Sequence, residues 1–168
     1  MGVASNIELL IFDGTTPLAQ PPAQANMVAL AGALSAIPVT EALLAALSGN
    51  GRACAPIRAG WMLRDCVCRL AQRLSRDRWT PYVAAETFGG LGIQEAMGWR
   101  NCEVAYGPSG SCDVTADLAD GYRVVQGAGS AINVGLRFMG IVAADSFDEF
   151  AAAGLNTHRF TDDWLTHF

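Results

Sequence analysis

Three β-prone segments joined by short connections in the middle of the chain constrain the fold more than any other feature. They cover residues 82–88, 93–99 and 102–106, and residues 89–92 (Gly-Gly-Leu-Gly) and 100–101 (Arg-Asn) separate them. Aromatic and β-branched residues between turns that contain Gly or Asn are typical of β-hairpins. We therefore predict an antiparallel meander, against which only the helix-forming composition of residues 94–97 argues.

Helices are predicted on both sides of this meander in the sequence. Helical spacing of apolar residues, or a capping residue at the start, indicates helices at residues 23–36, 41–48, 61–74 and 131–139. Ser146 and Glu149 have the spacing of a capping box before a further short helix, and Thr161 is placed to cap a last turn. A short, mostly apolar run at residues 7–12 predicts a buried strand, residues 122–126 are a further short strand candidate, and residues 107–110 predict a loop. We expect a single α/β (α+β) domain over residues 1–168, with an antiparallel sheet flanked by helices.

The composition excludes a disordered or membrane-spanning chain. Hydrophobic residues make up 51% of the sequence and charged residues 16%, which is typical of a chain that buries a core. The most apolar stretch, residues 23–47, is interrupted by Pro38 and Glu41 and is too polar for a membrane span of about 20 residues. No basic residue precedes the first apolar run, as a secretory signal would require. We expect a cytoplasmic protein that does not enter a membrane.

Acidic residues are concentrated in the second half of the chain. Residues 1–78 contain seven Arg and five acidic residues, whereas residues 79–168 contain four Arg and eleven acidic residues, and the net charge is −5. An acidic protein is a poor binder of nucleic acid and is suited to a basic protein partner. The same charge also keeps a protein soluble, so both interpretations stay open. Nothing in the sequence indicates the oligomeric state.

The cysteines predict reduced thiols. There are five, an odd number, without the spacing of a disulfide framework, and we expect no disulfide. Cys66 and Cys68 are two residues apart on a predicted helix and therefore point in different directions. No second Cys/His pair has zinc-finger spacing, so we expect no metal site and no cofactor.

One set of residues supplies the parts of a thiol-dependent hydrolase or amidase. Cys112 is the candidate nucleophile, His158 the candidate base, and an acid such as Asp113 or Asp145 would orient the imidazole. The pairing is chemically sound because an imidazole removes the thiol proton and the thiolate attacks. The competing interpretation of Cys112 is a buried, inert cysteine, which is the commoner role.

Two further motifs have a structural and a functional interpretation. Residues 89–92 offer backbone N–H groups that can bind a phosphate, but they lack the Lys-Ser/Thr of a P-loop and fit a hairpin connection better. The arginines between residues 64 and 78 form a basic stretch that fits a solvated helix face, or contact with nucleic acid or an acidic partner.

Three blocks stand in order over about the last ninety residues. They are Phe88-Gly-Gly-Leu-Gly-Ile-Gln94, then Ile132-Asn133 with Leu136-Arg137 and Gly140, then Asp148-Glu149-Phe150 with Gly154-Leu155 and His158-Arg159. In this order they resemble a family of small, uncharacterised bacterial cytosolic proteins, and the resemblance leaves the first seventy-eight residues uncovered. Small proteins of this type are often immunity partners of bacterial toxins. The resemblance therefore implies a non-enzymatic protein that neutralises a toxin by direct contact, with a structural or regulatory component of another assembly as a further alternative.

The polar residues in and beside these blocks are the candidate binding residues: Glu86, Gln94, Asn133, Arg137, His158 and Arg159. If they are functional, they converge on one exposed concavity. If they are structural, Arg137 or Arg159 pairs with a carboxylate, and Asn133 bonds to backbone near the Gly-rich connection. Blocks dense in Gly and aromatic residues usually record constraints of the fold, which favours the structural interpretation.

Overall fold

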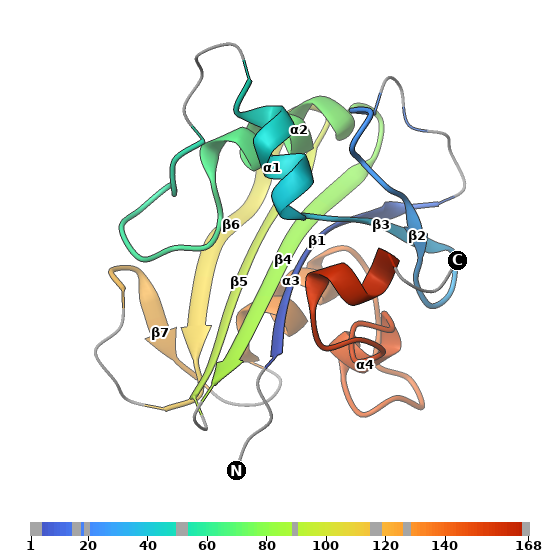
Figure 1. Ribbon diagram of the computed structural model, residues 1–168. Coiled ribbons are helices and arrows are strands. Elements are labelled where there is room, and N and C mark those ends of the chain that lie inside the picture. Colours follow the sequence, from blue (N-terminus) through green and yellow to red (C-terminus); the bar gives the residue numbers. More distant parts are fainter. Residues whose placement is uncertain are drawn as a thin grey trace.

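The computed structural model describes residues 5–14, 18, 21–49, 54–88, 91–114, 119–125 and 129–165. These residues form one sheet with helices on both faces, which confirms the predicted α+β class (Figure 1). The strand order is β2-β3-β1-β4-β5-β6-β7. β7 pairs parallel with β6 and every other pairing is antiparallel, so the sheet is mixed.

The strands are β1 (Ser5–Asp13), β2 (Val28–Ala29), β3 (Leu34–Pro38), β4 (Trp79–Phe88), β5 (Leu91–Arg100), β6 (Glu103–Cys112) and β7 (Tyr122–Val124). The helices are α1 (Glu41–Leu47), α2 (Asp65–Leu74), α3 (Ala131–Phe138) and α4 (Glu149–Ala152), followed by a short 3-10 helix, η2 (Thr161–Leu165). Within the described residues, no helix is both long enough and apolar enough to cross a membrane.

The predicted meander is confirmed, and its strands are longer than predicted. β4 and β5 pair from Trp79↔Arg100 to Phe88↔Leu91. The connection between them, Gly89-Gly90, lies outside the described residues. The loop predicted at residues 107–110 is wrong, because β6 continues through this segment to Cys112. The pairing of β5 with β6 is irregular between Ala96 and Gly98, and such an irregularity accommodates a proline inside a strand.

The helix predicted at residues 23–36 is wrong. The segment contains β2 and leads into β3, which pairs with β1 from Leu9↔Pro38 to Asp13↔Leu34. Gly32 has a φ of +66° at the turn between β2 and β3, and Leu30 N donates to Leu34 O at 2.9 Å to close it. Apolar spacing over a stretch rich in Ala is compatible with a helix and with a strand. The segment forms strands because β3 pairs with the edge of β1 that β4 does not occupy.

Two predicted helix starts also differ from the structure. α2 begins at Asp65 and not at Trp61, because the carboxylate of Glu95 accepts hydrogen bonds from the backbone N–H groups just before the helix. Asp148 caps α4 by accepting from Ala151 N at 2.9 Å, so the capping box predicted from Ser146 is wrong. The last turn is present as η2, but the Thr161 hydroxyl bonds to the β1 backbone and does not cap it.

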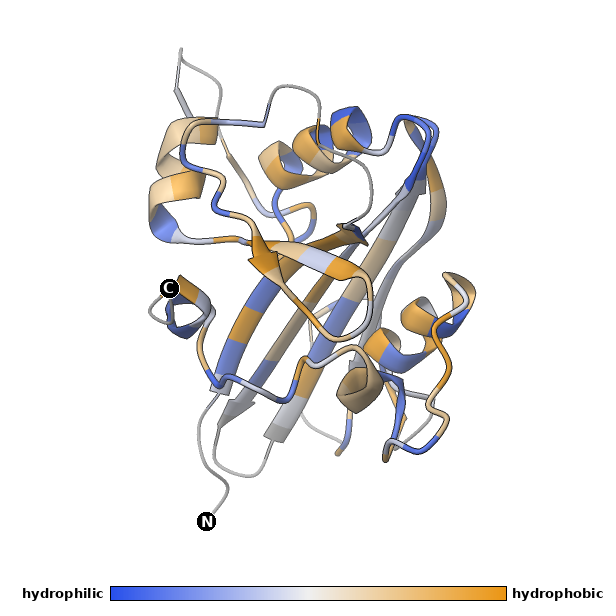
Figure 2. Cartoon of the chain, turned by 90° about the vertical axis from the view of Figure 1, so that its right-hand side faces the viewer, coloured by the Kyte–Doolittle hydropathy of each residue, from blue (hydrophilic) through white to orange (hydrophobic). Residues whose placement is uncertain are grey.

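Alternation along the central strands builds one hydrophobic core on each face of the sheet. Leu10 and Tyr82 pack with α1 and α2, whereas Leu9 and Val83 pack with α3, the segment after α4, and η2. Residues 9–12 are apolar throughout because this part of β1 is buried on both faces. Figure 2 shows the resulting bands of hydrophilic and hydrophobic residues along the strands.

The prediction of five reduced thiols is wrong for one pair. Cys54 and Cys66 form a disulfide with their Cα atoms 5.1 Å apart, and Cys68, Cys102 and Cys112 are free. The segment before α2 folds back on itself, so that Ala55 and Asp65 bond through their backbones and Cys54 reaches the first turn of the helix. The sequence spacing gave no indication of this, because the fold-back is an irregular loop.

Candidate binding groove

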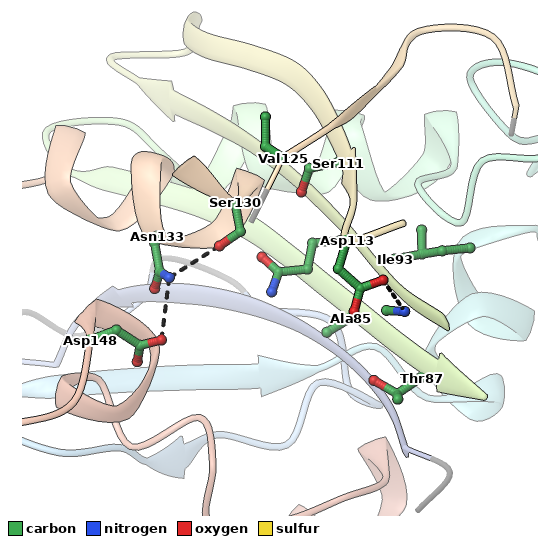
Figure 3. Close-up of a pocket in the computed structure, with 11 residues that line it drawn as sticks. Ala85, Thr87, Ile93, Ser111, Asp113, Val125, Ser130, Asn133 and Asp148 are labelled. Carbon is green, nitrogen blue, oxygen red and sulfur yellow. Dashed lines mark hydrogen bonds between the residues drawn. The ribbon is translucent and has the colours of Figure 1, made fainter. Parts of the chain in front are cut away.

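An open groove crosses the α3/α4 face of the sheet near the C-terminal end of β4 and the N-terminal end of β5. One part has a volume of about 270 Å³ and is bounded by β4, β5, β6 and α3. The other has a volume of about 350 Å³ and lies between β1, β4 and the segment around α4. Both parts are lined by Ala85, Thr87 and Gln94, so they form one continuous groove. Figure 3 shows the first part.

The floor of the groove is one row of side chains across neighbouring strands. The register places Ile7 beside Ala85, Ala85 beside Gln94, and Gln94 beside Ser111. Residues at these positions project from the same face of the sheet. The groove exists because the side chains at Ala85 and Thr87 are small, which leaves space between α3 and the segment after α4.

Two side chains of this row hold α3 against the sheet. Ser111 Oγ accepts from Ala131 N at 2.8 Å, and Gln94 Oε1 accepts from Ile132 N at 3.1 Å. The first N–H groups of a helix have no partner within the helix, and here strand side chains supply it. The oxygen of Gln94 is therefore structural. Its amide nitrogen has no acceptor among the described residues and remains a donor for an occupant of the groove.

Asn133 joins α3 to α4 at the wall of the groove. The residue is 2% exposed. Its Nδ2 donates to Ser130 Oγ at 3.1 Å and to Asp148 Oδ2 at 3.3 Å, as the dashed lines in Figure 3 show, and its Oδ1 accepts from Phe150 N at 2.9 Å. The described backbone partner of Asn133 is in α4, whereas the prediction placed a backbone partner near the Gly-rich connection, of which residues 89–90 lie outside the described residues.

The charged candidate residues occupy different places along the groove. Arg137 forms the predicted ion pair with a carboxylate, at 3.5 Å from Glu149, and this contact ties α3 to α4. His158 packs edge-on against Trp164, with ring centroids 4.7 Å apart, and Arg159 is exposed. His158 and Arg159 line the second part of the groove.

The two ends of the groove carry opposite charges. Asp113 and Asp148 line the first part, and His158 and Arg159 line the second. Asp113 Oδ1 accepts from Gly92 N at 2.9 Å, which fixes the carboxylate at the edge of the groove. The predictions missed Thr87 altogether and used Asp113 only as a helper of Cys112. The register of β4 with β5 would have identified Thr87, because it shares a face with Ala85.

No family model, curated protein or solved structure matches this chain. The geometry of the site therefore carries the functional argument.

Glu86 lies on the other face of the sheet, away from the five other candidate residues. It alternates with Ala85 and Thr87 along β4, so it projects toward the side of α1 and α2. There it lies near Glu95, whose fully buried carboxylate accepts from Met62 N at 2.8 Å, from Leu63 N at 2.9 Å and from the Tyr122 hydroxyl.

Burial raises the pKa of two carboxyls on this face, Glu8 and Glu95. Loss of hydration raises the pKa of Glu95 above its ordinary value, against the lowering effect of its three hydrogen bonds. The pKa of Glu8 is raised to about 7, chiefly by burial, and its carboxylate accepts from the Tyr82 hydroxyl at 2.9 Å. We interpret Glu95 as a structural clamp on residues 62–63 and β7.

Cys112 and His158 do not form a catalytic pair. Ser111 points toward α3, so the adjacent Cys112 points to the opposite face, where it is 1% exposed. His158 lies on the groove side. The sheet separates the thiol from the imidazole, and the arrangement needed for a Cys–His nucleophile is not assembled.

One group of potential metal ligands occurs in the described part of the chain. The ligand atoms of Cys54, Asp65 and Cys66 all lie within 4.8 Å of one another. The two sulfur atoms are bonded to each other in the structure, so they are not available to a metal in this state.

Proposed function

We propose that this chain is a binding protein that acts by contact with a basic protein partner in the cytoplasm, as an immunity protein neutralises a toxin. The observation that carries the proposal is the continuous groove, which gathers Gln94, Asn133, His158 and Arg159 from three separate segments. Proteins bind ligands and partner segments in such concave, partly preformed sites.

The chemistry of the groove favours binding over catalysis. Its lining offers a free amide donor on Gln94, hydroxyl groups on Thr87 and Ser130, and carboxylates at one end. These groups recognise polar and charged atoms, and the carboxylates of Asp113 and Asp148 favour a basic residue of the partner. The net charge of −5 would speed the encounter with a basic protein.

The test is affinity capture from cells of the native organism with three forms of the protein. Thr87→Trp fills the space shared by both parts of the groove, and Val104→Trp adds the same bulk at an exposed position of β6 outside the groove. A basic protein should be recovered with the parent and with Val104→Trp. Its affinity for Thr87→Trp should be about tenfold weaker or worse, as expected when a central contact is blocked.

The captured protein is then expressed alone and together with this chain. The immunity form of the proposal predicts that the captured protein alone stops growth and that co-expression restores it. A partner that binds Thr87→Trp as well as the parent contradicts the groove as the interface. A partner whose expression is harmless contradicts neutralisation of a toxin.

A further inference from the structure

The Cys54–Cys66 disulfide borders a small basic pocket that is remote from the groove. The pocket lies between α1 and α2 and has a volume of about 260 Å³. It is lined by Leu47, Cys66, Arg69, Leu70 and Arg73. Cys66, Arg69 and Arg73 follow each other at helical spacing on one face of α2, so the two guanidinium groups stand beside the disulfide.

The charges of this pocket are only partly neutralised. Arg69 pairs with Asp65 at 3.2 Å. Arg73 is exposed and has no acidic partner among the residues that the structure describes. A disulfide beside an unneutralised guanidinium group attracts an anion that carries a thiol, because the anion is held where its sulfur can react.

Two groups near the sulfurs favour thiolates, and they act against the Asp65 carboxylate, which lies within 4.8 Å of both sulfurs and is paired with Arg69. Cys66 lies in the first turn of α2, where the positive end of the helix stabilises a negative sulfur. Arg64 Nη1 donates to Cys54 O at 2.9 Å, which places a cation next to Cys54. A stabilised thiolate is a good leaving group in thiol–disulfide exchange.

We propose that the Cys54–Cys66 disulfide is a thiol–disulfide exchange site whose co-reactant is a small thiol that carries carboxylates. The carboxylates bind Arg69 and Arg73. The thiolate of the small molecule attacks Sγ of Cys54, the less buried residue of the pair, forms a new S–S bond to it, and displaces Cys66 as a thiolate, which takes a proton from water.

A second molecule of the small thiol completes the exchange. Its thiolate attacks the sulfur of the bound small thiol and displaces Cys54 as a thiolate. The products are the oxidised small-molecule disulfide and the protein dithiol, so two small thiols supply the two electrons that the protein gains. The bonds that tie the loop to Asp65 and to Glu95 do not involve the two sulfurs.

The experiment measures rates of disulfide reduction by three thiols of different charge. The oxidised protein is mixed, in the presence of EDTA, with anionic glutathione, neutral 2-mercaptoethanol or cationic cysteamine, quenched with iodoacetamide, and analysed by intact mass. Arg73→Gln removes a guanidinium group of the pocket. Arg76→Gln removes an exposed charge outside the pocket and is the matched control.

Arg73→Gln should slow the reduction of the disulfide by glutathione about threefold to tenfold at low salt, as expected for the loss of one nearby charge. The rate of reduction by 2-mercaptoethanol should stay within about twofold of the parent rate, and the rate of reduction by cysteamine should increase. Arg76→Gln should change none of the three rates appreciably. Equal changes for all three thiols, or no change for glutathione, would overturn the proposal. Alkylation of both Cys54 and Cys66 in an oxidised sample would also overturn it, because no disulfide would then be present.

Discussion

Two neighbouring rows of the same strands face opposite sides of the sheet and differ in what surrounds them. The row that contains Ala85 and Gln94 faces α3 and forms the floor of an open groove. The next row contains Ala84 and Glu95, faces the side of α1 and α2, and is closed over. Adjacent residues of one strand thus belong to different surfaces, of which one is open to a partner and the other packs within the fold.

Side chains from two other segments cover the closed row, which contains Ala84 and Glu95. Trp61 and Tyr122 pack together over Gly110, where an added Cβ would come within 3.0 Å of the Tyr122 ring and 3.1 Å of the Trp61 ring. Glu95 then has no contact with bulk water and must be satisfied internally. The groove has no such cover in the described part of the chain, so it is open, although Ser111 and Asn133 in its lining are buried.

The largest expected effect tests whether the closed row holds the fold. Glu95→Leu removes the acceptor for Met62 N, Leu63 N and the Tyr122 hydroxyl, so it should lower the free energy of unfolding by about 3–5 kcal/mol. Urea denaturation measures it, with Glu103→Leu at an exposed position as the control, expected within about 0.5 kcal/mol of the parent. A loss below about 1 kcal/mol for Glu95→Leu would show that the closed row does not stabilise the fold as described.

A smaller effect distinguishes a buried residue in the wall of the groove, Asn133, from an exposed residue at its rim, Asn156. Asn133→Ala leaves Phe150 N unpaired and weakens the join between α3 and α4, so it should destabilise by about 1–3 kcal/mol. Asn156→Ala makes the same change at an exposed position that lines the groove, and it should stay within about 0.5 kcal/mol. If thermal unfolding shows equal effects for both variants, the wall and the rim do not differ as described.

The smallest effect concerns the pH dependence of stability. The pKa of Glu8 is raised to about 7 in the folded protein, so the folded state holds this proton more tightly than the unfolded state does. Its contribution to stability is complete below the unfolded pKa, near 4.5, and is lost as pH rises through about 7. It amounts to about 1 kcal/mol after solvent screening.

The variant Glu8→Gln isolates this contribution. Unfolding free energies of the parent should fall relative to those of Glu8→Gln between pH 5 and about pH 8, since the amide cannot titrate. A constant difference over that range would mean that Glu8 titrates alike in the folded and unfolded states.

The part of the fold that could be predicted is the part fixed by local sequence. The meander followed from β-prone residues between tight turns, and α1 from a helical pattern that a glycine ends. β2 and β3 could not be found in this way, because residues 34–38 become a strand only by pairing with β1. The disulfide was missed for the same reason, since an irregular fold-back brings Cys54 to α2.

The candidate site was predicted in part. Gln94, Asn133, His158 and Arg159 do line one groove, whereas Arg137 contributes through its ion pair with Glu149. Glu86 was grouped with them because the sequence blocks do not show which face of a strand a residue occupies. The separation of Cys112 from His158 has the same cause, because the face of each depends on strand register.

Hydrogen exchange with and without the captured partner tests the central claim most directly. If the groove is the interface, binding should slow exchange at residues 85–88, 91–94 and 130–133 and leave α1 and α2 unchanged. Slower exchange confined to α1 and α2, with the groove residues unaffected, would show that the partner binds the closed face and would contradict the account.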